Sequence, residues 1–356
     1  MTSESPYAVD TFQSQAHAKR PSAMTCVCLA GLFSSLPLLL ISCGGSGGAS
    51  NPTSPPPSAD ACGRTGNDPD CHTLVFGGET RAYLLYVPSN FQPDSSALVI
   101  VLHGSGGSGA EMESSTGLDS KADQVGFAVA YPYALVAPGP GITEWKNFFD
   151  DSIWNGNPPN DIGFLSQMIT TIQDSIHNDP KEVYVTGISN GGLMAHRVGI
   201  QLSNLVAAIG VVEGTLYGFG GNVAGVPPEI APVSVLILHG DQDTVIPCCA
   251  TTGVASQEQT FDYWVGPLAN NCTVFDTTAP ICDAQGNITS VHEKDATGCL
   301  GNAEVKFYKL EGGIHTWYTQ PMNIPGQVPY NPAFNATTGV TTDDILWNFF
   351  AAHSKP

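Results

Sequence analysis

Apolar runs alternate along this chain with segments in which apolar residues recur at helical spacing. The runs at 97–102, 208–212 and 235–238 contain no charged residue. Such runs are typical of strands that are buried on both faces of a parallel sheet. Helical spacing marks the segments 110–125 and 162–176, which lie between these runs. The alternation predicts an α/β fold in which helices flank a doubly wound, mostly parallel sheet.

Shorter signals add further elements. Two β-prone runs flank residues 76–79 and predict a hairpin. Strands are expected at 127–131 and 305–310, and a closing helix is expected at 344–352. In the segment from 132 to about 158, apolar residues follow neither the spacing of a helix nor that of a strand, so this segment is expected to be irregular.

The helix at 162–176 has a candidate cap. Asp161 directly precedes its first apolar residue. A carboxylate at that position can accept hydrogen bonds from the free N–H groups of the first turn. Asp161 is therefore expected to be the N-cap.

The most informative stretch is a strand, a glycine-rich turn and a helix. Residues 183–186 are β-branched or aromatic, and Gly187-Ile188-Ser189-Asn190-Gly191 follows them before helical spacing resumes. A strand that turns into a helix within a few residues forces a strained backbone at the serine, and the glycines beside it leave the room for that turn. Ser189 is therefore predicted to be a nucleophile at the carboxyl end of a parallel sheet. The alternative is an ordinary glycine-rich turn.

A serine nucleophile needs a base, and the base needs a carboxylate that holds it. On an α/β sheet the acid and then the histidine follow the serine, each directly after a later strand. His315 follows the strand at 305–310 and has glycines beside it, and no other histidine after Ser189 has both features. Asp241 and Asp243 both follow the strand that ends at residue 240, so their spacing leaves the choice of acid open.

Acyl transfer through a tetrahedral intermediate also needs N–H donors for the oxyanion. One donor is expected from Asn190, which follows the nucleophile. The other is expected from Ser105, in the glycine-rich loop after the strand at 97–102. Trp264 and Trp317 each lie next to a motif and are candidates for substrate binding, although large aromatic residues more often belong to a core.

The N-terminal segment is predicted to direct export. Lys19 and Arg20 precede an uncharged apolar stretch at 24–41, which is typical of a secretory signal peptide. The sequence Leu40-Ile41-Ser42-Cys43 resembles the lipobox of bacterial lipoproteins. The resemblance implies cleavage before Cys43 and lipidation of that residue. A secreted protein is thus expected, anchored to a membrane by lipid and facing the periplasm or the cell exterior.

The domain division follows from composition. Residues 1–42 are the expected signal peptide, and residues 43–61 are rich in Gly, Ser and Pro and suit a flexible linker. Residues 62–356 are expected to form one catalytic domain. With 12 Lys and Arg among 356 residues and a formal net charge of −20, a nucleic-acid partner is not expected.

Seven of the ten cysteines lie in the expected domain, and none of the seven forms a C-x-x-C pair. A zinc ribbon is therefore not expected, and structural disulfides are favoured, with at least one thiol left over. Cys62 and Cys71 flank a short polar loop and are expected to pair. No metal site and no organic cofactor is implied.

Several segments, taken in order, resemble the esterase family that includes polyhydroxybutyrate depolymerases and feruloyl and acetylxylan esterases. They are LVIVLHGSGGSG, GFAVAYPY, NDIGFLSQMI, VYVTGISNGGLMAHR, VLILHGDQDTVIP, NNC, EGGIHTW and DDILWNFFAAH. The resemblance extends from about residue 62 to residue 353 and implies an α/β-hydrolase fold. It also implies Asp243 as the acid and a disulfide between Cys272 and Cys299.

The chain departs from this family at the rim of the site. Ile314 replaces a glycine that often precedes the histidine, and Tyr318-Thr319 replaces a Pro-Gly pair. The neighbouring cysteines Cys248 and Cys249 replace a loop that is commonly rich in Tyr and Gly. These changes leave the preferred substrate open.

The sequence thus predicts an extracytoplasmic serine carboxylesterase that works through an acyl-enzyme. Its expected substrate is a polyester such as polyhydroxyalkanoate, or a feruloyl or acetyl ester of plant polysaccharide. A peptidase of the same fold is one alternative, although such enzymes usually carry a gating or propeller domain for which the chain has no length left. A binding lipoprotein that keeps the scaffold without catalysis is the other.

Overall fold

The computed structural model describes residues 60–64, 68–147, 151–216, 226–249, 255–275, 280–283, 285–289, 291, 293–318 and 341–356. The expected signal peptide, the lipidation at Cys43 and nearly all of the expected linker lie outside these residues. None of the helices in the described ranges combines the length and the hydropathy that crossing a bilayer requires.

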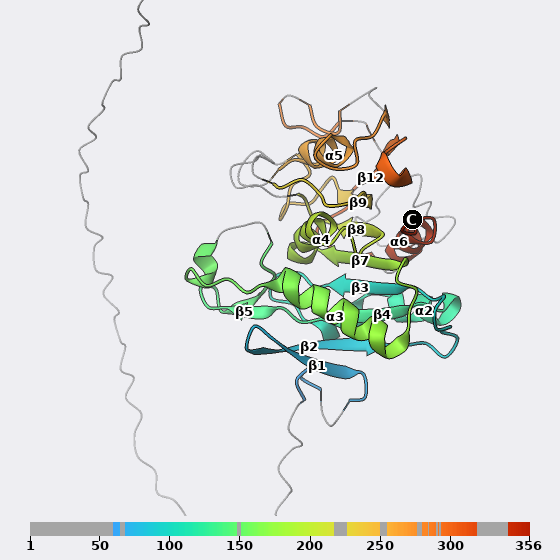
Figure 1. The fold of residues 1–356 in the computed structure, drawn as a ribbon. Coiled ribbons are helices and arrows are strands. Elements are labelled where there is room, and N and C mark those ends of the chain that lie inside the picture. The colour runs from blue at the N-terminus through green and yellow to red at the C-terminus, as the bar shows by residue number, and fades with distance from the viewer. Residues whose placement is uncertain are drawn as a thin grey trace, which may run out of the picture. The chain divides into compact units, whose positions relative to one another are not determined.

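One large sheet runs through the described residues, and its spatial order is β1-β2-β4-β3-β7-β8-β9-β12-β11-β10 (Figure 1). The strands are β1 (Cys71–Phe76), β2 (Glu79–Tyr86), β3 (Leu98–Leu102), β4 (Ala128–Pro132), β7 (Val183–Ile188), β8 (Ala208–Val212), β9 (Ser234–Gly240), β10 (Val274–Phe275), β11 (Glu293–Thr297) and β12 (Val305–Leu310). The strands from β4 to β12 in that order pair in parallel, and antiparallel strands extend both edges. The predicted fold class is confirmed.

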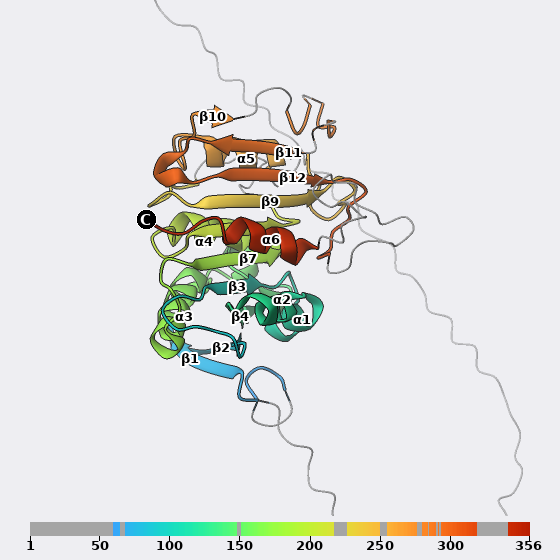
Figure 2. The same ribbon diagram turned by 90° about the vertical axis from the view of Figure 1, so that its right-hand side faces the viewer.

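Helices cover both faces of this sheet. The helices α3 (Asp161–Ile176), α4 (Asn190–Gln201) and α5 (Gln257–Val265) pack on one face. The helices α1 (Gly109–Ser115), α2 (Leu118–Val125) and α6 (Thr342–Phe350) pack on the other, and Figure 2 shows them in front of the strands. The chain therefore forms two hydrophobic cores, one on each side of the sheet.

Strand β3 shows why the central strands are apolar throughout. Leu98 and Ile100 belong to the core beneath α3 and α4, whereas Val99 and Val101 belong to the core beneath α1, α2 and α6. Successive side chains of a strand point to opposite faces, so a strand covered on both sides buries every residue. Each such side chain contributes about 1.5–3 kcal/mol of transfer free energy.

The segment 110–125 forms two helices, α1 and α2, where one was expected. Gly117 separates them, and its N–H donates to the Asp343 carboxylate of α6 over 3.1 Å. A Cβ atom at Gly117 would lie 2.5 Å from that carboxylate. The interruption thus lets the chain approach α6, a contact between distant residues that helical spacing cannot reveal.

The segment expected to be irregular contains a small antiparallel sheet of β5 (Leu135–Ala137) and β6 (Ile142–Glu144). A short 3-10 helix at Asp151–Trp154 follows it. The turn residues Gly139-Pro140-Gly141 between β-branched positions were the available signal for this hairpin.

Asp161 is not the cap of α3. The N-cap is Asn160, whose side chain accepts a hydrogen bond from the Gly163 N–H over 2.9 Å. Asp161 is fully buried, forms an ion pair of 2.8 Å with Arg81 of β2, and accepts a hydrogen bond from the Lys146 N–H. Burial raises the pKa of Asp161, and the Arg81 charge opposes that rise.

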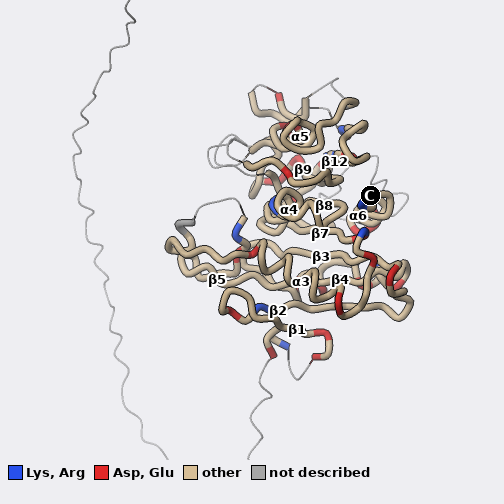
Figure 3. The backbone as a smooth tube through the Cα atoms, in the orientation of Figure 1, with Lys and Arg blue, Asp and Glu red and all other residues tan. Residues whose placement is uncertain are grey.

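Charged residues are unevenly represented. The chain has 32 Asp and Glu against 12 Lys and Arg. Figure 3 marks the Lys and Arg positions of the described chain, which lie on several different elements.

We expect Asp161→Ala to lower the free energy of unfolding by about 3–5 kcal/mol, because it leaves the buried Arg81 guanidinium without its anion. Asn160→Ala, one residue away, is the matched control and should cost only about 1 kcal/mol, the usual value of a helix cap. Urea unfolding followed by circular dichroism measures both. Equal losses would contradict the assignment of the buried pair as the more important contact.

Candidate active site

Ser189 lies at a sharp turn between β7 and α4, as the sequence predicts. Its backbone has φ of 56° and ψ of −123°, a conformation that is strained for any residue other than glycine. A Cβ atom at Gly187 would lie 2.6 Å from the backbone of Gly191, and one at Gly191 would overlap the carbonyl oxygen of Leu102. Only glycine fits at these two positions, so the motif is required by backbone packing.

His315 follows β12 and contacts Asp243, which follows β9. Its Nδ1 lies 2.7 Å from the Asp243 Oδ2. The other carboxylate oxygen accepts hydrogen bonds from the N–H groups of Val245 and Ile246, over 2.8 and 2.9 Å. Burial alone would raise the pKa of Asp243, but the hydrogen bond from His315, then the nearby His239 ring and the N–H of Ile246, outweigh burial and hold that pKa below its usual range. Asp243 is thus an ionised carboxylate that fixes the orientation of the imidazole.

Asp241, the other candidate acid, has a different partner. Its Oδ1 accepts a hydrogen bond from the Gly312 N–H over 2.7 Å. This bond ties the loop after β9 to the loop that carries His315. Of the two carboxylates that spacing could not separate, only Asp243 contacts the imidazole.

Ser189 and His315 line the same pocket, whose volume is about 320 Å³. Its wall comprises Gly104, Ser105, Gly107, Glu111, Met112, Ser115, Ile188, Ser189, His315, Thr316 and Trp317. No hydrogen bond joins Ser189 to His315 in the described part of the chain. Such contacts are often long without substrate and shorten in the reacting complex, so the pair shares a site without being engaged.

The two expected oxyanion donors come from different elements next to Ser189. Asn190 is the first residue of α4, where a backbone N–H has no partner within the helix. Ser105 lines the pocket in the loop after β3. Within the described ranges neither backbone N–H donates to another protein group. A Cβ atom on the neighbouring Gly104 would lie 3.4 Å from the Ser189 Cβ, so this loop directly adjoins the serine.

The β5–β6 hairpin, which sequence reasoning missed, supports the Ser105 loop. The Gly106 N–H donates to the Thr143 carbonyl over 2.8 Å, and the Thr143 hydroxyl donates to the Gly107 carbonyl over 2.6 Å. The Ser105 hydroxyl donates to the Glu144 carboxyl. Burial raises the pKa of Glu144, and the Ser105 hydrogen bond opposes that rise.

Trp145, directly after the hairpin, supports the other donor. Its N–H donates to the Asn190 Oδ1 over 2.8 Å, and the Asn190 side-chain amide donates back to the Trp145 carbonyl over 3.3 Å. The indole N–H of Trp145 donates to the His103 carbonyl over 3.0 Å. One short segment thus holds both sides of the expected oxyanion site.

The two tryptophans expected to contact substrate differ in their surroundings. Trp317 lines the pocket, and its indole N–H donates to Asp343 over 3.0 Å. The expectation for Trp264 is wrong, because its side chain is fully buried and its indole N–H donates to His196 Nδ1 over 3.0 Å. Trp264 belongs to the core beneath α5.

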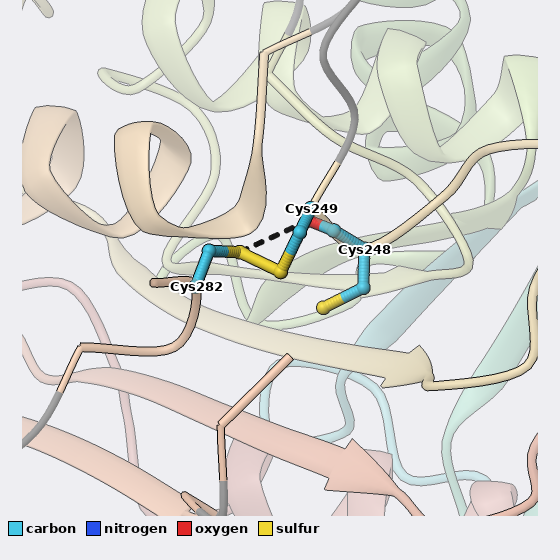
Figure 4. A group of neighbouring side chains, drawn as sticks. All are labelled: Cys248, Cys249 and Cys282. Carbon is cyan, nitrogen blue, oxygen red and sulfur yellow. Dashed lines mark hydrogen bonds between the residues drawn. A yellow bond between two sulfur atoms is a disulfide. The ribbon is translucent and has the colours of Figure 1, made fainter. Parts of the chain in front are cut away.

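Three disulfides lie in the described residues. Cys62 pairs with Cys71 and Cys272 pairs with Cys299, as expected. Cys249 pairs with Cys282, a pairing that the sequence left open, and Cys248 is the buried free thiol beside that bond (Figure 4). Burial raises the pKa of the Cys248 thiol far above its usual range. The Cys249–Cys282 bond fastens the loop that follows Asp243.

Comparisons with known proteins find similar esterases. The sequence model of the family described as "Esterase PHB depolymerase" matches residues 81–227, which include the Ser105 loop and the Ser189 turn. NocK of Nocardia uniformis subsp. tsuyamanensis, which is named as an esterase, is 27% identical over 78% of this chain and 80% of its own length. Feruloyl esterase C of Emericella nidulans is 26% identical over 69% of this chain and 83% of its own.

Two further matches are more limited. A bifunctional acetylxylan esterase/xylanase of Neocallimastix patriciarum is 30% identical over 48% of this chain, which corresponds to 22% of that protein. Among solved structures, an acetyl xylan esterase from Aspergillus awamori covers 66% of this chain and 89% of its own, with 19% identity and a TM-score of 0.46. Residues 81–227 are thus similar to the family described as "Esterase PHB depolymerase", the chain is similar over most of its length to proteins named as esterases, and it is a carboxylic ester hydrolase.

Proposed function

We propose that this protein is a serine carboxylesterase in which Ser189 is the nucleophile, His315 the base and Asp243 the acid. The observation that carries the proposal is a shared pocket. The strained turn presents Ser189 to the cavity that His315 also lines, while His315 is hydrogen-bonded to Asp243 over 2.7 Å. This is the arrangement that activates a serine hydroxyl.

The Asp243 carboxylate accepts the Nδ1–H of His315, which leaves Nε2 as the proton acceptor. In the proposed reaction His315 Nε2 takes the proton of Ser189 as the hydroxyl oxygen attacks the ester carbonyl. The same proton then passes to the leaving alcohol, and an acyl-enzyme remains. Water, deprotonated by His315, releases the acid and restores the serine.

The developing oxyanion would be bound by the N–H groups of Ser105 and Asn190. Each such donor is worth about 3–4 kcal/mol of transition-state stabilisation in mutational tests. The contacts of Thr143 and Trp145 support this role, because they hold the two loops in place before substrate binds. Preorganised donors cost no rearrangement during the reaction.

The proposed substrate is an ester of a polymer, either a feruloyl or acetyl ester of plant polysaccharide or a short-chain polyhydroxyalkanoate. The names of the relatives favour the polysaccharide esters, and the description of the matched family favours the polyester. A pocket of about 320 Å³ with an aromatic wall at Trp317 suits one acyl group, with the polymer outside.

We also propose that the enzyme acts outside the cytoplasm, attached through lipid on Cys43. The support is the apolar stretch at 24–41 and the lipobox-like sequence that follows it. Residues 44–60, rich in Gly, Ser and Pro, would then separate the catalytic domain from the membrane.

Ser189→Ala should lower the turnover of p-nitrophenyl acetate by about 10⁴-fold or more, because it removes the hydroxyl on which the proposed acyl-enzyme forms. A fluorophosphonate probe should label the wild type and leave the variant unlabelled. Circular dichroism of the variant controls for folding. A Ser189→Ala protein that keeps its activity would overturn the proposed function.

The two neighbouring aspartates offer a matched pair. Asp243→Asn should lower kcat by about 10³–10⁴-fold, since the amide cannot stabilise the imidazolium or fix its tautomer. Asp241→Asn keeps the acceptor for the Gly312 N–H and should change kcat by about threefold or less. Steady-state kinetics on one ester decides the assignment, and the reverse order of effects would make Asp241 the acid.

Rates on methyl ferulate, acetylated xylan and polyhydroxybutyrate film separate the proposed substrates. If the acyl group is aromatic, Trp317→Ala should lower kcat/KM for methyl ferulate about tenfold and for p-nitrophenyl acetate much less, because only the larger group contacts the indole. Trp264→Phe, a buried control, should alter stability without altering this ratio. Equal losses on both esters would exclude Trp317 as a selectivity residue.

A further inference from the structure

A second carboxyl group, that of Glu213, lies close to Asp243, the proposed catalytic acid. Glu213 follows β8, as Asp243 follows β9, and these two strands are neighbours in the sheet. The Glu213 side chain is fully buried, and both its oxygens accept from the Gly240 N–H, over 3.1 and 2.9 Å. Its backbone has φ of 47°, which costs conformational energy in a residue with a side chain. The chain thus keeps a strained, buried acid next to the reacting groups.

His239 is also fully buried, and its Nε2 lies near both carboxyls. One carboxylate oxygen each of Glu213 and Asp243 and one ring nitrogen of His239 all lie within 4.8 Å of one another. The Gln257 side-chain amide contacts the Gly214 carbonyl over 2.7 Å, so its NH₂ must face that acceptor. The same NH₂ contacts His239 Nδ1 over 2.8 Å, which makes Nδ1 an acceptor and places the histidine proton on Nε2.

The N–H at Nε2 of His239 donates its hydrogen bond to a backbone carbonyl and not to either carboxyl group. Nε2 lies 2.7 Å from the Ile246 carbonyl, to which it donates. Burial lowers the pKa of His239, so the ring is neutral. Nε2 is 3.7 Å from Glu213 and 3.5 Å from Asp243, and it brings no positive charge to either carboxyl.

The partners of the two carboxyls decide which of them carries the negative charge. Asp243 accepts three hydrogen bonds, from His315, Val245 and Ile246. Glu213 has the single N–H of Gly240. Two carboxylates this close inside a protein cannot both ionise without a compensating cation, so the pair keeps one proton. Burial, and then the charge of Asp243 and a hydrogen bond to it, raise the pKa of Glu213 well above its usual range.

Other titratable or charged groups also act on this site. Those that act on Glu213 or on its immediate neighbours are His239, Asp241, Asp243, Cys248, Lys309, His315 and Tyr318. Most of the groups on this list are acidic or neutral, which favours the protonated form of Glu213 further.

We propose that Glu213 is a positioning residue for the catalytic acid: its carboxylic acid accepts the Gly240 N–H and donates its proton in a hydrogen bond to Asp243. The proposal rests on the proposed function, since it assigns Glu213 a role through Asp243 and His315. Glu213 is absent from the wall of the pocket and so does not touch substrate. The donated hydrogen bond holds the carboxylate toward His315 and lowers its tendency to take the imidazole proton during the reaction.

Two substitutions separate this role from a merely structural one. Glutamine has the shape of a protonated glutamic acid, with an oxygen for the Gly240 N–H and an NH₂ for Asp243. Glu213→Gln should therefore keep kcat and kcat/KM within about threefold, with an unchanged acid limb in the pH profile of kcat/KM. Glu213→Leu removes both contacts and should lower kcat about 10- to 100-fold, with KM nearly unchanged.

An infrared readout tests the protonation state without reference to activity. At pH 7.5 the spectrum of the wild type minus that of Glu213→Gln should show the C=O band of a buried carboxylic acid; the subtraction removes the band of Glu229, whose pKa burial raises to about 8. This measurement still decides the protonation state of Glu213 if Glu213→Leu does not fold. A difference spectrum without such a band would overturn the inference.

Kinetics gives a second, independent decision. If Glu213 were an anion, Glu213→Gln would remove a negative charge near the imidazole and move the acid limb to lower pH by about one unit. That shift would overturn the inference, as would a folded Glu213→Leu with wild-type kcat. Ser189→Ala, assayed in parallel, keeps the two hypotheses apart. An active Ser189→Ala refutes the proposed function, whereas an inactive one beside a fully active Glu213→Leu refutes only the role of Glu213.

Discussion

The close approach of two backbone segments is the constraint on which the rest of the site depends. The turn after β7 lies so near the end of β3 that a side chain at Gly191 would overlap the Leu102 carbonyl. This contact forces Ser189 into its strained conformation and also brings the Ser105 loop beside it. The proposed nucleophile and the proposed oxyanion loop are therefore positioned by the same close packing, between strands β3 and β7 that pair directly in the sheet.

The segment between β6 and α3 links the fold to this turn through buried polar contacts. Asp161, held by Arg81, accepts the Lys146 N–H, and Arg197 of α4 donates to the carbonyls of Lys146 and Asn147. Trp145, next in the chain, contacts Asn190. The Asp161–Arg81 ion pair is thus linked through Lys146 and Trp145 to Asn190, one of the two proposed oxyanion donors.

Local sequence was sufficient for the elements whose cause is local. The five residues around Ser189 predict the sharp turn from a strand into a helix. The uninterrupted apolar run of β3 predicts a strand that is buried on both faces of the sheet. Spacing could not choose between Asp241 and Asp243, because both follow the same strand and only the position of His315 separates them. Asp161 and Trp264 were misread for a related reason. In the sequence Asp161 stands at the start of a helix and Trp264 stands near a motif. Their actual partners, Arg81 and His196, are distant along the chain and cannot be identified from local sequence.

The strand ends illustrate a general limit on reading charge from sequence. In a parallel sheet the residues that follow neighbouring strands meet at one edge, so Glu213 after β8 and Asp243 after β9 were bound to be close. From the sequence alone, Glu213 and Asp243 would both be assigned a negative charge. Whether a buried carboxyl group is ionised depends on the hydrogen-bond donors that the fold places around it. Three donors converge on Asp243 and one on Glu213. The fold therefore makes one carboxyl an anion and leaves the other an acid, so that two identical functional groups acquire different chemical roles from their surroundings.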